Sequence, residues 1–263
     1  MFKKVYLFVF FYILEKSILH LHHQKIKQTK NYTMKRLTFF MAFATMISGL
    51  FAQNCAEYYP LSTGSNWEMT QYNKKDKLES INHVKVSSYS DTDNGYLAVL
   101  TSSTIDDKGN QAGTSEVWMK CENVVFYFDM NNFIPSSTLE TYKDMELDVV
   151  ATDLQYPETL ESGANLNDAS ITFQAKSNGF PVITININIT NRKVEGKESV
   201  VTPAGTFEAW KISYNVDSKI GIIKAHSRII EYLSPGNGIV KSETYNEKGA
   251  LQGYSLLTKI EKK

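Results

Sequence analysis

The chain is poor in the residue that most enzymes use for acid–base chemistry. Only five histidines occur in 263 residues, and three of them, His20, His22 and His23, precede residue 34. His83 and His226 are the remaining two, and no G-x-S-x-G nucleophile elbow accompanies them. The closely spaced ligands of a zinc site are also missing. We therefore expect no catalytic residues, no metal and no cofactor, and we interpret the chain as a non-enzyme.

Long apolar runs are absent as well. The apolar stretch 37–52 is short for a membrane span, which needs about 20 apolar residues. It follows Lys35 and Arg36 and precedes small and polar residues, which is the order of parts in a secretory signal peptide. We assign the signal peptide to residues 34–52, and we interpret residues 1–33 as a start-site artefact or a disordered leader. Residues 53–263 then form a single β-rich domain that does not span a membrane after cleavage.

The expected domain has no long basic run. Residues 1–52 hold eight of the 28 basic side chains and one of the 28 acidic ones, which leaves 20 basic and 27 acidic side chains, a net charge of −7. A phosphate-backbone partner requires the opposite sign of charge. We expect no nucleic-acid partner.

Cysteine is scarce too, with Cys55 and Cys121 alone in the chain. Cys55 follows the apolar stretch closely, but Ala52 and Asn54 occupy the positions where a lipobox has Leu and Gly or Ala. We therefore favour a soluble periplasmic or extracellular product over a lipid-anchored one. In an oxidising compartment the two cysteines form either a disulfide or two free thiols, and their sequence positions do not decide between them.

The chain does contain runs in which apolar and polar residues alternate with a period of two. Ile183, Ile185, Ile187 and Ile189 share one face of a run whose other positions are Thr and Asn. Such a pattern predicts a strand with one buried and one wet face. We predict strands over residues 66–73, 80–90, 95–105, 114–121, 123–130, 143–151, 169–177, 181–195, 206–219, 222–233, 238–246 and 250–260.

Turn sequences separate these runs at short intervals. They are residues 93–95, 107–110, 203–205, 235–238 and 247–249, all of which contain glycine. We expect an all-β fold with a curved antiparallel sheet, a half-barrel or barrel-like meander, and few or no helices. The pattern weakens over residues 131–168, which we expect to form either a cap over the sheet or a seam between two half-sheets.

One group of polar residues is a candidate ligand site. Lys224, His226 and Arg228 alternate along one predicted strand, so their side chains share a face. Three cationic groups together could bind an anionic headgroup or a carboxylate. The alternative is a solvated sheet face whose charges meet acidic residues of the next strand, such as Glu243.

Several short blocks carry a family resemblance. The blocks are residues 58–67 (YYPLSTGSNW), 191–196 (NRKVEG), 202–211 (TPAGTFEAWK) and 233–243 (LSPGNGIVKSE). Together they make the chain similar to the TapB-like family of exported bacterial proteins of unknown function, which is related to a broader group of domains of unknown function. The resemblance implies a location in or beyond a Gram-negative envelope and an all-β fold. It brings no catalytic residues.

These observations lead to two expectations of function. The first is an exported, non-catalytic binding protein whose curved sheet holds an apolar or amphipathic, lipid-like molecule, because the strands are rich in aromatic residues that can line a glycan or lipid groove. The second is a structural or assembly protein of the cell envelope that acts through contacts with another envelope protein.

Overall fold

The computed structural model describes residues 55, 57–134 and 136–263. The predicted leader (1–33) and signal peptide (34–52) lie outside the described residues. Thirteen strands account for most of what is described. They are β1 (Asn66–Asn73), β2 (Leu78–Thr92), β3 (Gly95–Asp106), β4 (Gln111–Glu122), β5 (Val125–Phe128), β6 (Glu146–Thr152), β7 (Leu154–Tyr156), β8 (Ala169–Ser177), β9 (Phe180–Thr202), β10 (Gly205–Ile220), β11 (Ile223–Ser234), β12 (Gly238–Asn246) and β13 (Leu251–Glu261).

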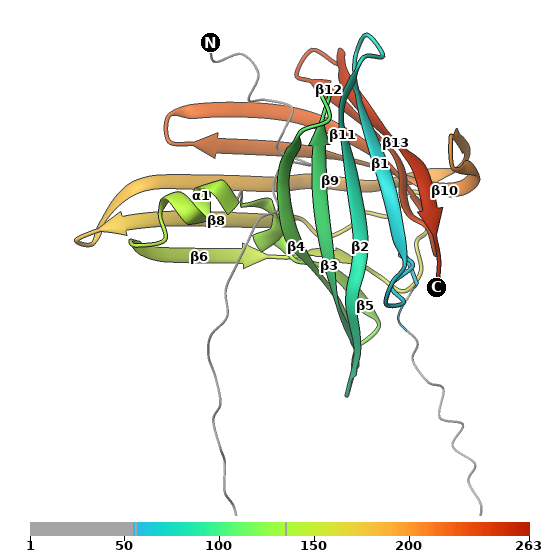
Figure 1. The fold of residues 1–263 in the computed structure, drawn as a ribbon, viewed down its shortest axis with the longest axis horizontal. Coiled ribbons are helices and arrows are strands. Elements are labelled where there is room, and N and C mark those ends of the chain that lie inside the picture. Colours follow the sequence, from blue (N-terminus) through green and yellow to red (C-terminus); the bar gives the residue numbers. More distant parts are fainter. Residues whose placement is uncertain (1–54, 56, 135) are drawn as a thin grey trace, which may run out of the picture. The chain divides into compact units, whose positions relative to one another are not determined.

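All thirteen strands belong to one antiparallel sheet. Its order is β6-β8-β9-β10-β11-β12-β13-β1-β2-β3-β4-β5-β7, so most neighbours in space are also neighbours in sequence. The sheet curls strongly, and β8 and β9 cross the view of Figure 1 while β1 to β4 run close to upright. The expectation of a curved, barrel-like antiparallel sheet is confirmed. Short hairpin turns at the five predicted glycine positions connect β2 to β3, β3 to β4, β9 to β10, β11 to β12 and β12 to β13.

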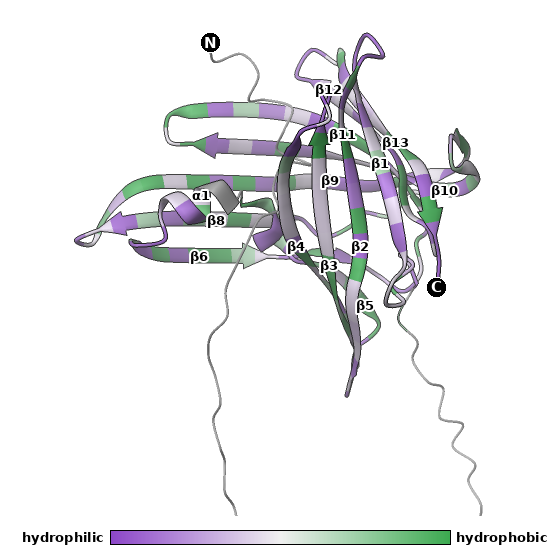
Figure 2. Ribbon diagram, viewed as in Figure 1, coloured by the Kyte–Doolittle hydropathy of each residue, from purple (hydrophilic) through white to green (hydrophobic). Residues whose placement is uncertain are grey.

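The alternation in β9 has the predicted consequence. Ile185, Ile187 and Ile189 are at most 3% exposed and face the inside of the sheet. Figure 2 shows the alternation of apolar and polar residues along this strand. Burial of these β-branched side chains holds this strand against the core.

A β-bulge then reverses which positions face inward. Asn191 has a φ of 55°, and the register between β9 and β10 shifts between Ser213 and Asn215. Asparagine accepts this left-handed conformation more readily than most residues. Beyond the bulge the buried positions are Arg192 and Val194, which have even numbers, whereas the buried isoleucines have odd ones. The strand continues to Thr202, well past the predicted end at residue 195.

The region 131–168 contains more structure than its sequence pattern predicted. The strand expected over residues 123–130 ends at Phe128, and a 3-10 helix (η2, Met130–Phe133) follows it. A six-residue helix, α1 (Ser136–Thr141), and the short strand β7 come next. β6 and β7 lie at opposite ends of the strand order, so this part of the chain runs along the seam where the two edges of one continuous sheet approach each other, and not between two half-sheets.

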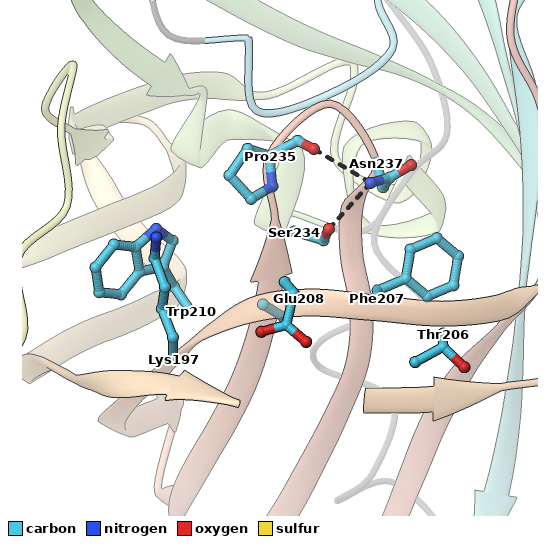
Figure 3. A pocket seen from close by; sticks show the side chains of 9 residues that line it. Lys197, Thr206, Phe207, Glu208, Trp210, Ser234, Pro235 and Asn237 are labelled. Atoms are coloured by element: carbon cyan, nitrogen blue, oxygen red, sulfur yellow. Dashed lines mark hydrogen bonds between the residues drawn. The ribbon is translucent and has the colours of Figure 1, made fainter. Parts of the chain in front are cut away.

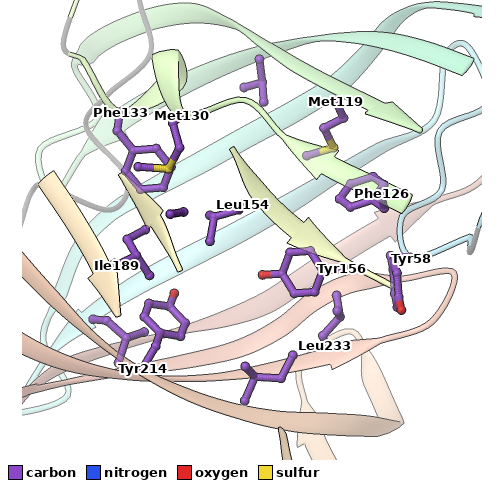
Figure 4. Packing of buried hydrophobic residues seen from close by; sticks show 14 of the residues in the cluster. Tyr58, Met119, Phe126, Met130, Phe133, Leu154, Tyr156, Ile189, Tyr214 and Leu233 are labelled. Carbon is purple, nitrogen blue, oxygen red and sulfur yellow. The ribbon is translucent and has the colours of Figure 1, made fainter. Parts of the chain in front are cut away.

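Side chains from both edges of the sheet and from η2 fill the space inside the seam. Figure 4 shows Met130, Phe133 and Leu154 near Ile189, with Tyr156 and Tyr58 further along the same cluster. Aromatic contacts join segments inside the sheet, for example the edge-on contact of Tyr58 with Phe126 at a centroid distance of 5.8 Å. This end of the sheet interior is therefore a packed core.

A disulfide joins Cys55 to Cys121 of β4, with 6.0 Å between the two Cα atoms. Gly95, at the start of β3, lies directly against it. A Cβ at this glycine would lie 2.1 Å from the carbonyl oxygen of Cys121 and 3.3 Å from Sγ of Cys55. The disulfide ties the beginning of the described domain to β4, the third strand from one edge of the sheet.

Candidate functional site

A pocket of about 390 Å³ lies where the β9–β10 hairpin meets the β11–β12 turn (Figure 3). Its walls come from one residue of β9, five consecutive residues of β10 and the end of β11 with the turn that follows. They are Lys197, Thr206, Phe207, Glu208, Ala209, Trp210, Ser234, Pro235 and Asn237. Two of the sequence blocks, 202–211 and 233–243, therefore meet at one place although they are far apart in the chain.

The β9–β10 turn positions the first wall. The Thr202 hydroxyl accepts a hydrogen bond from the Ala204 amide (3.2 Å) and donates one to the Gly205 carbonyl (3.3 Å). This closes the turn around Pro203. The Ala204 amide also donates to the carbonyl of Leu257 in β13, at 3.3 Å. The hairpin end is thus anchored on the sheet and presents β10 to the pocket.

The β11–β12 turn positions the second wall. The backbone N–H of Asn237 donates a hydrogen bond to the Ser234 carbonyl at 2.9 Å. The Asn237 side chain donates to the Ser234 hydroxyl (3.0 Å) and to the Pro235 carbonyl (3.1 Å), as Figure 3 shows. A side chain that bonds its own turn in this way holds the turn rigid.

The start of the first sequence block and the residue before it hold this turn in place. The amides of Gly236 and Gly238 donate to the carbonyls of Glu57 (2.6 Å) and Tyr58 (2.7 Å). Gly238 has a φ of 76°, and a Cβ there would lie 2.4 Å from the Tyr59 ring. The glycine is required both for the turn and for the close approach of this ring.

The pocket offers an aromatic surface between two opposite charges. The Lys197 ammonium lies 4.5 Å from the ring centroid of Trp210, within the range of a cation–π contact. Glu208 is exposed and makes no hydrogen bond or ion pair with a described residue. No described histidine or cysteine lines the pocket. This chemistry suits binding by stacking and hydrogen bonding, and it provides no nucleophile paired with a base.

A second polar group lies inside the sheet. Arg192 is 1% exposed, and one of its terminal nitrogens donates to the carbonyls of Gln155 in β7 (3.1 Å) and Asn167 (2.6 Å). Its guanidinium lies 4.8 Å from the ring centroid of Tyr156. Because β7 and β9 lie on opposite sides of the seam, Arg192 links the two ends of the sheet. Its other two nitrogens have no hydrogen-bond partner among the described residues.

The counter-charge of Arg192 is Glu231 of β11, which is 2% exposed. Burial raises the pKa of Glu231 to about 7, against the lowering effects of the Tyr214 hydroxyl and the Arg192 charge. Burial and the Glu231 carboxylate in turn raise the pKa of Tyr214. We interpret the group as a structural pair that closes the sheet, because its two charges lie in the core away from the pocket walls.

The structure places Lys224, His226 and Arg228 on the outer face of β11, at the end opposite to the pocket. His226 Nδ1 lies 2.7 Å from Oδ1 of Asp217, which is its cross-strand neighbour in β10. The positive charge of Arg228 acts on Glu195. The three residues share a face, but two of them already have acidic neighbours there. A ligand site at these residues stays a prediction.

Sequence reasoning did not single out Lys197, Glu208 and Asn237 as site residues. Glu208 and Asn237 lie within the resemblance blocks, which could have indicated them, whereas Lys197 follows directly after the block 191–196. Arg192 and Glu231 were also missed. Glu231 has a visible signal, since it lies between Ile229 and Leu233 on an apolar face.

Among the described residues, no group of three or more histidine, cysteine or acidic side chains is arranged to hold a metal ion. In the same part of the chain, no helix has the length and apolar character that crossing a bilayer would require.

Solved structures share this fold. A "putative exported protein with YmcC-like fold" from Bacteroides fragilis is 24% identical, with a TM-score of 0.64 over 79% of this chain and 100% of that chain. A "putative lipoprotein" from Parabacteroides distasonis is 22% identical, with a TM-score of 0.65 and the same coverage. No curated protein matches the chain in sequence. The model of the DUF3108-like family matches residues 62–257. The resemblance to the TapB-like proteins stays a prediction. The chain belongs to the DUF3108-like family.

Proposed function

We propose that the chain is an exported, non-catalytic binding protein that takes a compact amphipathic ligand in the Trp210 pocket. The observation that carries the proposal is the meeting of two sequence blocks, 202–211 and 233–243, at one pocket with an indole, a free carboxylate and an ammonium group. The turns that build the pocket are closed by hydrogen bonds within the chain, so the site exists before a ligand arrives. Export rests on the predicted signal peptide.

The size and lining of the pocket favour one class of amphipathic ligand. A volume of about 390 Å³ lies at the low end of the range for small-molecule sites, which is about 300–1,000 Å³. Glu208 and Thr206 can accept hydrogen bonds, while Trp210 and Phe207 can pack against an apolar face. A sugar ring has this character, because its faces carry C–H groups and its edges carry hydroxyls. A diacyl lipid is a poorer match, since the apolar walls are small.

Native mass spectrometry of the protein recovered from the producing cells tests the proposal. We expect a bound small molecule on the wild-type chain, its loss from Trp210→Ala and weaker retention by Glu208→Gln. Trp118→Ala is the matched control, because Trp118 is 43% exposed on β4, away from the pocket. An adduct that Trp210→Ala retains as well as Trp118→Ala does would refute the site. A wild-type chain without any adduct would instead favour the envelope-assembly alternative.

A further inference from the structure

The ends of two neighbouring hairpins carry exposed aliphatic and aromatic side chains. On the β10–β11 hairpin, Ile222 is 97% exposed, Ile223 50% and Ile220 36%. On the β8–β9 hairpin, Phe180 is 75% exposed and Val182 54%. Figure 2 shows the apolar colouring at the turn between β10 and β11. We name these five residues the hairpin-end patch.

The two hairpins lie side by side in the sheet. Ile220 is the cross-strand partner of Ile185 in β9, and the Gly221 amide donates to the Thr184 carbonyl at 3.0 Å. A Cβ at Gly221 would meet nothing within 4 Å, so the β10–β11 turn projects into open space. Figure 1 shows both hairpins extending past the edge of the upright strands.

Positive charge flanks the patch. Lys219 and Lys224 are directly opposite each other in the β10–β11 register, both are exposed, and neither forms an ion pair with a described residue. Like charges in opposing positions destabilise a sheet. The nearest carboxylate on the same hairpin, Asp217, is engaged with His226. On β8, Lys176 is paired with Asp148. The unpaired charge at the end of the β10–β11 hairpin is therefore positive, although residues 53–263 carry a net charge of −7.

We propose that the hairpin-end patch docks the protein onto an anionic lipid surface. The aliphatic side chains enter the boundary between headgroups and acyl chains, and the two lysines meet lipid phosphates, which relieves their mutual repulsion. A second copy of this chain is a poorer occupant, because it would bring the same two lysines. A projecting turn also offers little area to a rigid protein face, whereas a lipid surface deforms around it. The docking is independent of the Trp210 pocket.

Flotation with lipid vesicles tests the proposal on the protein as recovered after export. We expect binding to vesicles of phosphatidylglycerol and phosphatidylethanolamine, and much weaker binding to phosphatidylcholine. Lys219→Gln with Lys224→Gln should weaken binding by about 25-fold at low salt, at about fivefold for each charge lost. Ile222→Ser with Ile223→Ser should weaken it by about tenfold. Val201→Ser is the control, because Val201 is 76% exposed on β9 outside the patch.

A direct measure of insertion comes from Ile222→Trp. The emission of this tryptophan should shift to shorter wavelength with anionic vesicles and be quenched by brominated acyl chains. The proposal is overturned if the lysine and isoleucine variants bind vesicles as the wild type does, or if the wild type ignores anionic vesicles. Unfolding curves that match the wild type show that the variants are folded, and this is expected because all the changed side chains are exposed.

Discussion

Glu231 offers a test of how the closed sheet is held together. Its carboxylate lies in the core, where Arg192 of β9 and Tyr214 of β10 act on it, and burial raises its pKa to about 7 from the ordinary value of 4.5. Tyr59 and Tyr156 also face this group, and burial raises the pKa of each of them. These tyrosines stay neutral in the range where Glu231 titrates. The perturbation is Glu231→Gln, which keeps the shape of the side chain and removes its proton equilibrium.

The magnitude follows from linkage between protonation and folding. Because the pKa of Glu231 is higher in the folded chain, folding favours the protonated form. The stabilisation is complete below pH 4.5 and is lost as the pH rises to 7. A shift of about 2.5 units corresponds to about 3 kcal/mol, and roughly 2 to 3 kcal/mol of it falls between pH 5 and pH 8. The wild-type chain should lose that much stability over this range on account of Glu231.

Denaturant unfolding followed by tryptophan fluorescence, at pH 5 and at pH 8, measures this loss. Glu231→Gln should lack it, so the difference between variant and wild type should change by roughly 2 to 3 kcal/mol between the two pH values. The absolute stability of the variant is less informative, because the substitution also leaves Arg192 without its counter-charge. Glu116→Gln, at an exposed position of β4, is the control and should follow the wild type at both pH values.

The reasoning fails if wild type and Glu231→Gln lose the same stability between pH 5 and pH 8. Glu231 would then titrate outside this range, and the raised pKa that we attribute to its burial would be wrong. A loss shared by Glu116→Gln and the wild type but absent from Glu231→Gln supports the assignment to this one buried carboxylate.

Two further sets of substitutions test the disulfide and the β11–β12 turn. Replacing Cys55 and Cys121 by serine should lower the free energy of unfolding by about 4 kcal/mol, because the disulfide closes a loop with a sequence separation of 66 and so restricts the unfolded chain. Reduction of the wild type should lower the denaturant midpoint by a similar amount. An unchanged midpoint would contradict this explanation by the entropy of the unfolded chain. Gly238→Ala should cost about 3 kcal/mol, since a left-handed φ and contact with the Tyr59 ring both oppose a Cβ. Gly249→Ala, with a φ of 73° and open space around it, should cost only about 1 kcal/mol in the same thermal melts, and equal costs would refute the clash.

Most strands could be predicted because their signals are local. A run such as 183–189 alternates with a period of two, and a glycine turn such as 247–249 ends a strand without help from distant residues. The end of β9 could not be predicted in this way, because the bulge at Asn191 shifts the inward positions from odd to even numbers. Only the partner strand β10 shows that Arg192 takes the place of an apolar residue.

The candidate site was likewise predictable only in part. The blocks 202–211 and 233–243 were visible as turns leading into strands, and the pocket residues Glu208 and Asn237 lie within them. That the two blocks meet depends on the pairing of β10 with β11 and on the curl of the sheet, which brings the β9–β10 turn onto β13. Lys197 joins them because it is the cross-strand neighbour of Trp210 in the β9–β10 hairpin, and it was missed because the predicted strand ends at residue 195 while β9 runs to Thr202.

By itself, the sequence determined the all-β class, most strand limits and the turn positions, because steric preferences and alternation act over a few residues. The tertiary structure alone decided the closure of the sheet. Arg192 reaches the carbonyl of Gln155, 37 residues earlier in the chain, and Glu231 supplies the compensating charge from a third strand. The tertiary structure also decided the pocket and the exposed hairpin ends. Such contacts form only when the whole sheet curls, since their energy depends on burial and on neighbours that lie far away in the chain.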